Sequence, residues 1–240
     1  MYFSVERKVF EYLPNAVFGA VVVSGMDNAK PQPQIAALLA ENIAMREAYF
    51  ENAKIKEAPE ILPYREAFKA LEINPNKFMC SIEALLTRIA KKKGLPSINP
   101  AVDLGNALSL KYCLPIGAHD LDTVGEGLDV RFAQEGDTFL AFGSDEMELP
   151  APDELIYVAN HQVRTRRWTW RQSEIGKITE NTANILYPID GFEDINRDLV
   201  VKATEDFINL AQTCFGCNAQ VGFIDKSNPG FGFSMKIKIT

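Results

Sequence analysis

Between Pro115 and Tyr187, short β-branched or alternating stretches follow one another, and no segment between them has the length and pattern of a helix. Antiparallel strands need only a turn between them, whereas parallel strands need a long crossover connection that is usually a helix. This spacing therefore predicts a run of largely antiparallel strands, with turns at Gly143, Asn160 and Gly191. The predicted strands are 128–132, 138–142, 155–159, 166–170 and 184–187.

The segments on either side of this run mostly have the pattern of helices. Apolar residues recur there at three- and four-residue steps, and prolines or glycines mark the ends. One such segment ends in three lysines followed by Gly94, which is typical of a helix C-terminus. We predict helices at 35–56, 59–71, 81–88, 102–111 and 198–214, and further strands at 16–23, 220–224 and 234–239.

The order of these elements predicts the fold class. No internal repeat, low-complexity tract or long linker divides the chain. Helices come first, strands dominate the middle, and a helix with two strands closes the sequence. We therefore expect a single domain over residues 1–240, of the α/β (mixed α+β) class, with a central mostly antiparallel or mixed sheet flanked by helices.

The overall charge narrows the possible functions. The chain has 240 residues, a formal net charge of −7 and a sequence pI near 5.0. Proteins that coat nucleic acid through bulk charge are basic, so that class is disfavoured, although a local basic groove stays possible. The longest apolar run, 16–23, is much shorter than the roughly 20 residues of a membrane span. The N-terminus has charges where a secretory signal is apolar, so we expect a cytoplasmic protein without a membrane partner.

The four cysteines do not indicate a metal site. Cys214 and Cys217 form a CxxC pair, but a closed zinc site needs four ligands and the sequence has no second cluster. The pair also falls at the end of a predicted helix, whereas redox pairs use the beginning, where the helix dipole lowers a thiol pKa. We interpret Cys80, Cys113, Cys214 and Cys217 as thiols and expect neither a metal nor another cofactor.

Four arginines and both tryptophans of this acidic chain fall within residues 163–174. If the segment is extended, one face buries aromatic rings and the other presents guanidinium groups, which bind carboxylate or phosphate. The alternative is a solvated edge strand whose charges discourage aggregation. The period of two places Arg166, Trp168, Trp170 and Gln172 on one face, and Arg167, Thr169, Arg171 and Ser173 on the other.

Only two histidines are present. His119 lies beside Asp120 and Asp122, acidic residues that can orient an imidazole or raise its pKa. His161 follows Asn160 in a predicted turn, and we assign it no role.

Three short motifs carry a resemblance to a known family. They resemble the IN-x-x-VD-x-x-N, QP-[LM]-HAFD and V-x-R-x-A-x-x-GE motifs of the B3/B4 domain, the editing module in the beta subunit of bacterial phenylalanyl-tRNA synthetase. The resemblance covers about residues 60–190, with the N-terminal strand and helix and the C-terminal helix and strands as extensions. Nothing here resembles the synthetase's other modules, so the chain looks like a free-standing relative. The motifs are Ile98-Asn99-Pro100-Ala101-Val102-Asp103-Leu104-Gly105-Asn106, Leu114-Pro115-Ile116-Gly117-Ala118-His119-Asp120, and Val130-Arg131-Phe132-Ala133 with Glu135-Gly136.

The resemblance implies an editing activity and suggests where it resides. In the synthetase the domain hydrolyses tyrosine wrongly attached to the phenylalanine tRNA. The family's editing glutamate precedes a threonine by eight positions, and aligning that threonine with Thr182 places Glu174 on the glutamate. The family histidine falls on Gly117, but His119 lies two positions on and faces the same side of an extended segment. The family's glycines before the glutamate are replaced by Trp168, Thr169, Gln172 and Ser173, which leaves the amino-acid specificity open.

By this resemblance we predict a free-standing aminoacyl-tRNA deacylase that hydrolyses the ester of a mischarged tRNA in trans, without a covalent nucleophile. The alternatives are a non-catalytic module that binds an amino acid, a small carboxylate or RNA, and a purely structural role. Binding to tRNA should be weak given the net charge, and the oligomeric state is not indicated. The implied residues are His119 and Glu174 for catalysis; Asn99, Asn106, Arg171 and Thr182 for the substrate; and Arg166, Arg167, Lys91, Lys92 and Lys93 for RNA.

Overall fold

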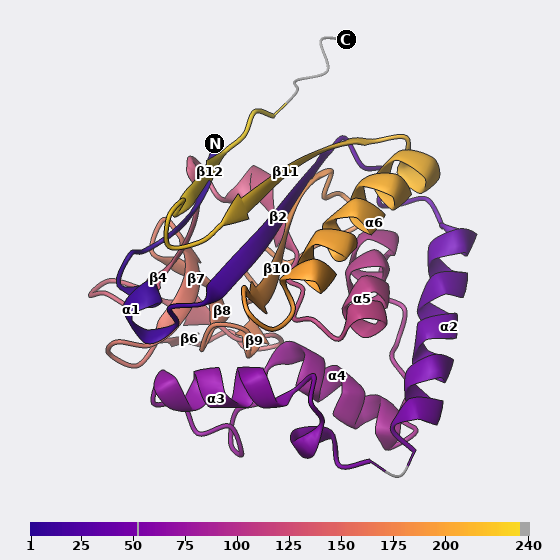
Figure 1. The fold of residues 1–240 in the computed structure, drawn as a ribbon. Helices are drawn as coiled ribbons and strands as arrows, with labels where there is room; N and C mark the ends of the chain where they lie inside the picture. Colours follow the sequence, from indigo (N-terminus) through magenta and orange to yellow (C-terminus); the bar gives the residue numbers. More distant parts are fainter. Residues whose placement is uncertain (52, 236–240) are drawn as a thin grey trace.

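Two sheets share one apolar core in the computed structural model, which describes residues 1–51 and 53–235 (Figure 1). In the larger sheet, β1 and β4 are parallel and all other neighbours are antiparallel. Its strands, in spatial order, are β12 (Gly230–Gly232), β1 (Tyr2–Val5), β4 (Gly127–Phe132), β7 (Leu155–Ala159), β8 (Gln162–Arg166) and β9 (Arg171–Gln172).

The smaller sheet is antiparallel throughout. Its two long inner strands run side by side from Asn184 opposite Ser24 to Phe192 opposite Ala16. Its spatial order is β11 (Asn218–Ile224), β2 (Ala16–Ser24), β10 (Asn184–Phe192) and β3 (His119–Asp120). A separate pair is formed by β5 (Phe139–Leu140) and β6 (Met147–Glu148).

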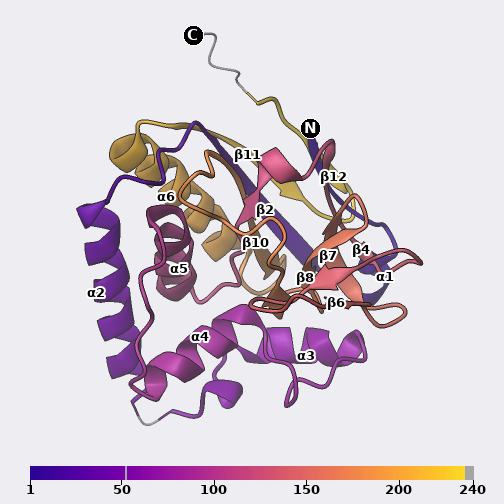
Figure 2. The ribbon, with the colours of Figure 1, turned by 180° about the vertical axis from the view of Figure 1, so that it is seen from behind.

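The helices cover the smaller sheet and close one end of the molecule (Figures 1 and 2). The longest helix, α6 (Arg197–Phe215), packs on β2, β10 and β11. Next to it lies α5 (Pro100–Tyr112), and α2 (Pro33–Tyr49) packs on α5 from outside. The remaining helices are α1 (Val9–Tyr12), α3 (Leu62–Ala70), α4 (Ser81–Ala90) and the 3-10 turns η1 (Ile55–Glu57) and η2 (Leu121–Thr123).

The predicted mixed α/β class is confirmed, with the strands divided between two main sheets. Strands β2, β4, β7, β10 and β11 and helices α3, α4, α5 and α6 lie where the sequence predicts them. The short strands β1, β3, β6 and β12 were not predicted, because two to four residues carry too little alternation to be recognised. The strand predicted at 234–239 lies outside the described residues from position 236 onward.

The single helix predicted at 35–56 is wrong. Helix α2 ends at Tyr49, and a separate 3-10 turn follows at Ile55–Glu57. Phe50 and Ile55 are both buried. Residues five apart lie about 140° apart around a helix, so one continuous helix would not turn both side chains toward the same core.

The strand predicted at 166–170 is also wrong. Strand β8 ends at Arg166, residues 167–170 form a turn, and β9 begins at Arg171. Arg167 and Trp168 have φ values of 45° and 58°, a left-handed conformation that costs a side-chain-bearing residue roughly 1–2 kcal/mol. Trp168 is completely buried, and burial of an indole offsets a cost of this size. The two-faced arrangement of arginines and tryptophans expected for an extended segment is therefore absent here.

No helix in the described part of the chain has the length and apolar character needed to cross a bilayer.

The single-domain prediction can be tested by limited proteolysis at 93–98, the exposed connection between α4 and α5. The larger sheet combines β1 with strands from the middle and the C-terminal part of the chain, so a cut at this connection leaves both halves dependent on each other. We expect the two fragments to stay associated on size-exclusion chromatography and to melt in one transition. Fragments that separate and each unfold cooperatively would show that there are two domains.

Candidate functional site

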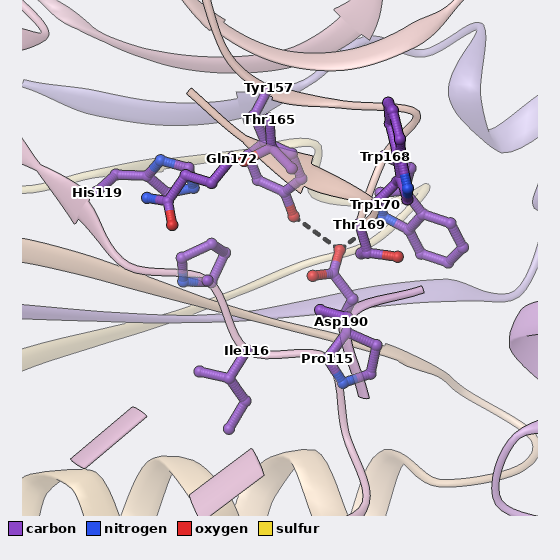
Figure 3. Close-up of a pocket in the computed structure, with 13 residues that line it drawn as sticks. Pro115, Ile116, His119, Tyr157, Thr165, Trp168, Thr169, Trp170, Gln172 and Asp190 are labelled. Atoms are coloured by element: carbon purple, nitrogen blue, oxygen red, sulfur yellow. Dashed lines mark hydrogen bonds between the residues drawn. The ribbon is translucent and has the colours of Figure 1, made fainter. Parts of the chain in front are cut away.

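A partly enclosed cavity of about 80 Å³ lies where the two sheets meet (Figure 3). It has room for several water molecules, since each needs roughly 10–15 Å³ on this measure. The segment before β3 forms one wall and the turn between β8 and β9 forms another. The lining residues are Ser81, Pro115, Ile116, Gly117, His119, Tyr157, Thr165, Trp168, Thr169, Trp170, Gln172, Pro188 and Asp190.

Hydrogen bonds along β10 hold the first wall in place. Asp190 N donates to Pro115 O at 3.0 Å, and Gly117 N donates to Pro188 O at 3.0 Å. Further along, His119 of β3 pairs with Leu186 of β10. The segment from Pro115 to His119 therefore follows the edge of β10, and the His119 ring at its end reaches Tyr157 of the larger sheet.

The Asp190 carboxyl group anchors the second wall. Its Oδ1 accepts a hydrogen bond from Trp168 Nε1 at 2.6 Å and another from the Tyr157 hydroxyl at 2.7 Å (Figure 3). Tyr157 belongs to β7 of the larger sheet, and Trp168 lies in the turn after β8. These two bonds therefore position the turn and tie the sheets together around the cavity.

His119 is 2% exposed, and its ring stacks on Tyr157 with 5.3 Å between the ring centroids. Burial, reinforced by the positive charge of Arg164, lowers the pKa of His119 to about 3. The imidazole is therefore neutral at physiological pH. Its Nδ1 is buried without a hydrogen-bond partner among the described residues, and the same is true of Thr169 Oγ1.

Gly117 makes room for this imidazole. A Cβ at position 117 would lie 3.2 Å from His119 Nε2 and 3.2 Å from Pro188 Cγ. Both contacts are tighter than ordinary van der Waals contact. A side chain at position 117 and the imidazole of His119 in its present position therefore compete for the same space.

Asp190 is the carboxyl group among the described residues that line the cavity, and the guanidinium group of Arg164 acts on His119 from outside that lining. Burial raises the pKa of Asp190 to about 7, although the bonds from Tyr157 and Trp168 favour the ionised form. Burial also raises the pKa of Tyr157 well above its usual value. None of the described residues that line the cavity is Lys or Arg. A carboxyl group that ionises near neutral pH is thus the dominant charge of the site.

Comparison with known proteins identifies a family for this chain. The model of the B3/4 domain family matches residues 63–216, which is more than half of the chain. The chain belongs to the B3/4 domain family. Two relatives are both named phenylalanine–tRNA ligase beta subunit. The one from Pectobacterium atrosepticum is 30% identical over 96 residues, 40% of this chain and 12% of the relative. The one from Staphylococcus haemolyticus is 26% identical over 175 residues, 70% of this chain and 20% of the relative.

This B3/4 chain thus spans a small part of the length of those relatives. A crystal structure of an N-terminal fragment of the phenylalanyl-tRNA synthetase beta-subunit from Pyrococcus horikoshii is similar with a TM-score of 0.46 and 10% identity. That comparison covers 90% of this chain and 49% of the other.

The structure brings His119 into the cavity of the B3/4 domain but leaves Glu174 outside its lining. Glu174 is 30% exposed at its side chain and forms an ion pair with Lys177, not with Arg171. Its backbone N donates to Leu140 O at 2.9 Å. The Glu174 carboxylate therefore already has a cation partner and does not face the cavity.

The other predicted substrate residues lie on neighbouring elements. Thr182 is buried, and its hydroxyl donates to Asp120 Oδ2 at 2.8 Å. Asn99 caps α5 by accepting a bond from Val102 N at 3.0 Å. Asn106 is half-buried on α5. None of the three lines the cavity, and the bonds of Thr182 and Asn99 stabilise the local backbone.

The predicted RNA contacts divide into buried and exposed groups. Arg166 is 7% exposed and bonds to Glu154 at 2.8 Å and to Glu148 at 2.7 Å, so its guanidinium group serves the fold and does not reach an external phosphate. Arg167 is half-buried over the Phe78 ring, with its guanidinium carbon 3.9 Å from the centroid. Lys91, Lys92 and Lys93 are exposed. Arg171, the fourth predicted substrate residue, is also exposed and does not line the cavity.

Sequence reasoning missed Asp190, the main charged group of the cavity. One signal was available: in Asn184–Phe192 the aspartate is the only ionisable residue besides Tyr187 within an otherwise apolar strand. A carboxyl group in such a strand is buried, and a buried carboxyl group needs donors. The donors themselves come from distant positions, so they are not identifiable from the strand.

We predict that Asp190 titrates near pH 7 and that Trp168 reports it. The groups facing Asp190 are Tyr157, His119 and Tyr64, whose hydroxyl donates to the Asp190 backbone O at 2.9 Å. Burial raises the pKa of both tyrosines well above 10 and lowers that of His119 to about 3, so none of them changes charge between pH 5 and pH 8. In ¹H–¹⁵N spectra, the Trp168 indole signal should shift with a midpoint near pH 7. Trp170→Phe assigns the signal, because the chain has two tryptophans.

The same titration predicts how stability depends on pH. Asp190 binds its proton more tightly when folded, with a pKa of about 7 against 3.8 for the ordinary group. Its favourable contribution is therefore complete below about pH 4 and is lost as the pH rises to 7, by a few kcal/mol. Asp190→Asn should remove this loss, and the exposed control Asp145→Asn should not. An Asp190→Asn protein with the wild-type pH dependence of unfolding would contradict the assignment.

Proposed function

We propose that this chain hydrolyses the ester bond of an aminoacyl-tRNA charged by another enzyme, with the aminoacyl group in the cavity. Membership of the B3/4 family and the names of the relatives support this proposal. The observation that carries it is the neutral His119 imidazole, which has no hydrogen-bond partner among the described residues, beside a cavity without Lys or Arg in its described lining. Such a site suits the uncharged ester linkage of an aminoacyl group and the water that attacks it.

Hydrolysis adds water to the ester carbonyl, passes through a tetrahedral oxyanion, and releases an amino acid and the terminal ribose hydroxyl. A neutral imidazole donates at one nitrogen and accepts at the other, so His119 can hold the water or the ribose hydroxyl in position. With a pKa of about 3, the ring is a weak base at neutral pH, and we assign it an orienting role. The Thr169 hydroxyl has no partner among the described residues and is the donor we assign to the oxyanion.

The rival function, binding of a free amino acid or small carboxylate, has less support. A carboxylate removed from water needs a cation or several donors. The arginines that were candidates for this role do not line the cavity: Arg167 lies over the Phe78 ring, and Arg171 is exposed. An ester needs no cation at this position, because its carbonyl end is uncharged.

The exposed lysines are our proposed contacts to the tRNA backbone. Helix α4 begins with Ser81 at the cavity, and Lys91, Lys92 and Lys93 follow its last residue. Ten helical residues span about 15 Å, so the lysines lie about that far from the cavity. A tRNA whose terminal ribose enters the cavity would then place phosphates of its acceptor end near these charges.

Removing the imidazole should reduce hydrolysis. In a screen of tRNAs charged with each amino acid, we expect His119→Ala to lower the hydrolysis rate of the best substrate by about 10²-fold, the usual scale for one positioned polar group. Thermal melting checks that the variant is folded.

His161→Ala is the matched control for this experiment, because its imidazole is 60% exposed and lies outside the cavity. It should retain wild-type activity. Full activity of the His119→Ala variant would contradict the orienting role that we assign to His119. If the wild-type protein hydrolyses no aminoacyl-tRNA, the proposed function is wrong.

The lysines should determine how tRNA binding depends on salt. If all three contact phosphates, replacing them together by alanine should reduce the slope of log affinity against log salt by about 2 to 3. Replacing the exposed Lys30, Lys202 and Lys226 removes the same charge elsewhere and should change the slope less. Equal slopes for the wild-type protein and the Lys91, Lys92 and Lys93 variant would place the RNA on another surface.

A further inference from the structure

The two oxygens of the Asp190 carboxyl group have different environments. Oδ1 accepts both available hydrogen bonds, from Tyr157 and Trp168. Oδ2 accepts none from the described residues, although Asp190 is only 2% exposed. Figure 3 shows Oδ2 pointing away from Trp168, toward the side of the cavity where His119 and Gln172 lie. A nearly buried carboxyl oxygen is therefore held in a fixed direction and is available to a ligand.

The surroundings of this oxygen favour a positively charged ligand group. A buried carboxylate is stable only if a cation or several donors meet it. Two donors already fix Oδ1, and no described lining residue supplies a cation. The pKa of about 7 reflects this missing partner, because burial without a counter-charge favours the protonated form.

We propose that Asp190 binds the ammonium group of the ligand and makes the cavity selective for amino acids whose carboxyl group is esterified or amidated over free amino acids. The choice of an esterified ligand rests on the proposed function, whereas the assignment of the ammonium group rests on Asp190 itself. The family resemblance assigned the substrate-binding carboxylate to Glu174, which already pairs with Lys177. We assign the role of substrate-binding carboxylate to Asp190 instead, because its carboxyl group lines the cavity.

Charge balance explains the selectivity. A free amino acid carries an ammonium and a carboxylate, and its carboxylate would enter a small cavity that offers it no cation and already contains Asp190. An ester or amide carries the ammonium alone, so its single charge is neutralised by Asp190.

The first experiment measures binding without hydrolysis. Amino-acid amides from L-alaninamide to L-tryptophanamide are titrated into the full chain while the two indole N–H signals are followed. For the best amide, we expect binding at least about tenfold tighter than that of the free amino acid and of the same amide lacking its amino group. Equal binding of the free amino acid, or no change of either indole signal with any amide, would overturn the proposal.

The second experiment tests Asp190 directly. Asp190→Asn keeps the shape and an acceptor for Tyr157 and Trp168, and it should remove the preference for the ammonium group. The exposed control Asp145→Asn should keep it. Unchanged amide binding by a folded Asp190→Asn protein would overturn the proposal.

A measurement on the wild-type protein does not depend on any variant folding. At pH 6 Asp190 is mostly protonated, and an ammonium group favours its ionised form. Calorimetry in buffers of different ionisation enthalpy should therefore detect the release of up to about one proton per bound amide. Binding without proton release would contradict Asp190 as the partner.

These results also separate the proposal from the deacylase function. Asp190-dependent amide binding in a protein that hydrolyses no aminoacyl-tRNA supports the ammonium site and overturns the deacylase. Hydrolysis by Asp190→Asn with the wild-type KM supports the deacylase and overturns the ammonium site.

Discussion

The paired hydrogen bonds from Tyr157 and Trp168 to Asp190 are the interaction on which the arrangement of the two sheets around the cavity depends. They join β10 of the smaller sheet to β7 of the larger one and fix the turn after β8. The backbone of the same aspartate accepts a bond from Tyr64 on α3, and Asn196 before α6 donates to that tyrosine hydroxyl at 3.0 Å. One buried residue thus connects both sheets and two helices, and it does so with one carboxyl oxygen still available.

Much of the fold was predictable because it follows from local pattern. The strands at Ala16–Ser24 and Asn184–Phe192 and the helix at Arg197–Phe215 are long, periodic and bounded by turn residues. The predictions that were wrong concern segments whose backbone conformation depends on tertiary contacts. The turn at 167–170 adopts left-handed backbone at two large residues because the Trp168 indole reaches Asp190, a partner 22 positions away. No pattern within the turn contains that information.

The candidate site was predictable only in part, and for the same reason. His119 was selected because it lies beside Asp120 and Asp122 and two positions after the residue aligned with the family histidine, and the structure places it in the cavity. The arginine-rich segment was interpreted as a possible recognition surface. In the structure, Arg166 forms ion pairs with Glu154 and Glu148, and Arg164 donates a hydrogen bond to the Thr123 backbone. Clustered arginines in an acidic chain meet nearby carboxylates during folding, so sequence clustering alone does not distinguish structural ion pairs from a binding surface.

The proposed substrate carries charges opposite to those of the two regions assigned to it, the cavity with Asp190 and the exposed lysines after α4. A polyanion would be repelled by Asp190 in the cavity, whereas the exposed lysines after α4 attract it. In an aminoacyl ester at the end of a nucleic acid, the phosphates are negative but the aminoacyl group is positive, because its ammonium is its only charge. Gly117 leaves the space that the His119 imidazole occupies at the cavity, and burial holds that imidazole neutral. A protonated imidazole beside Asp190 would supply the missing counter-charge internally, and the carboxylate would then have no need of an ammonium group from the ligand.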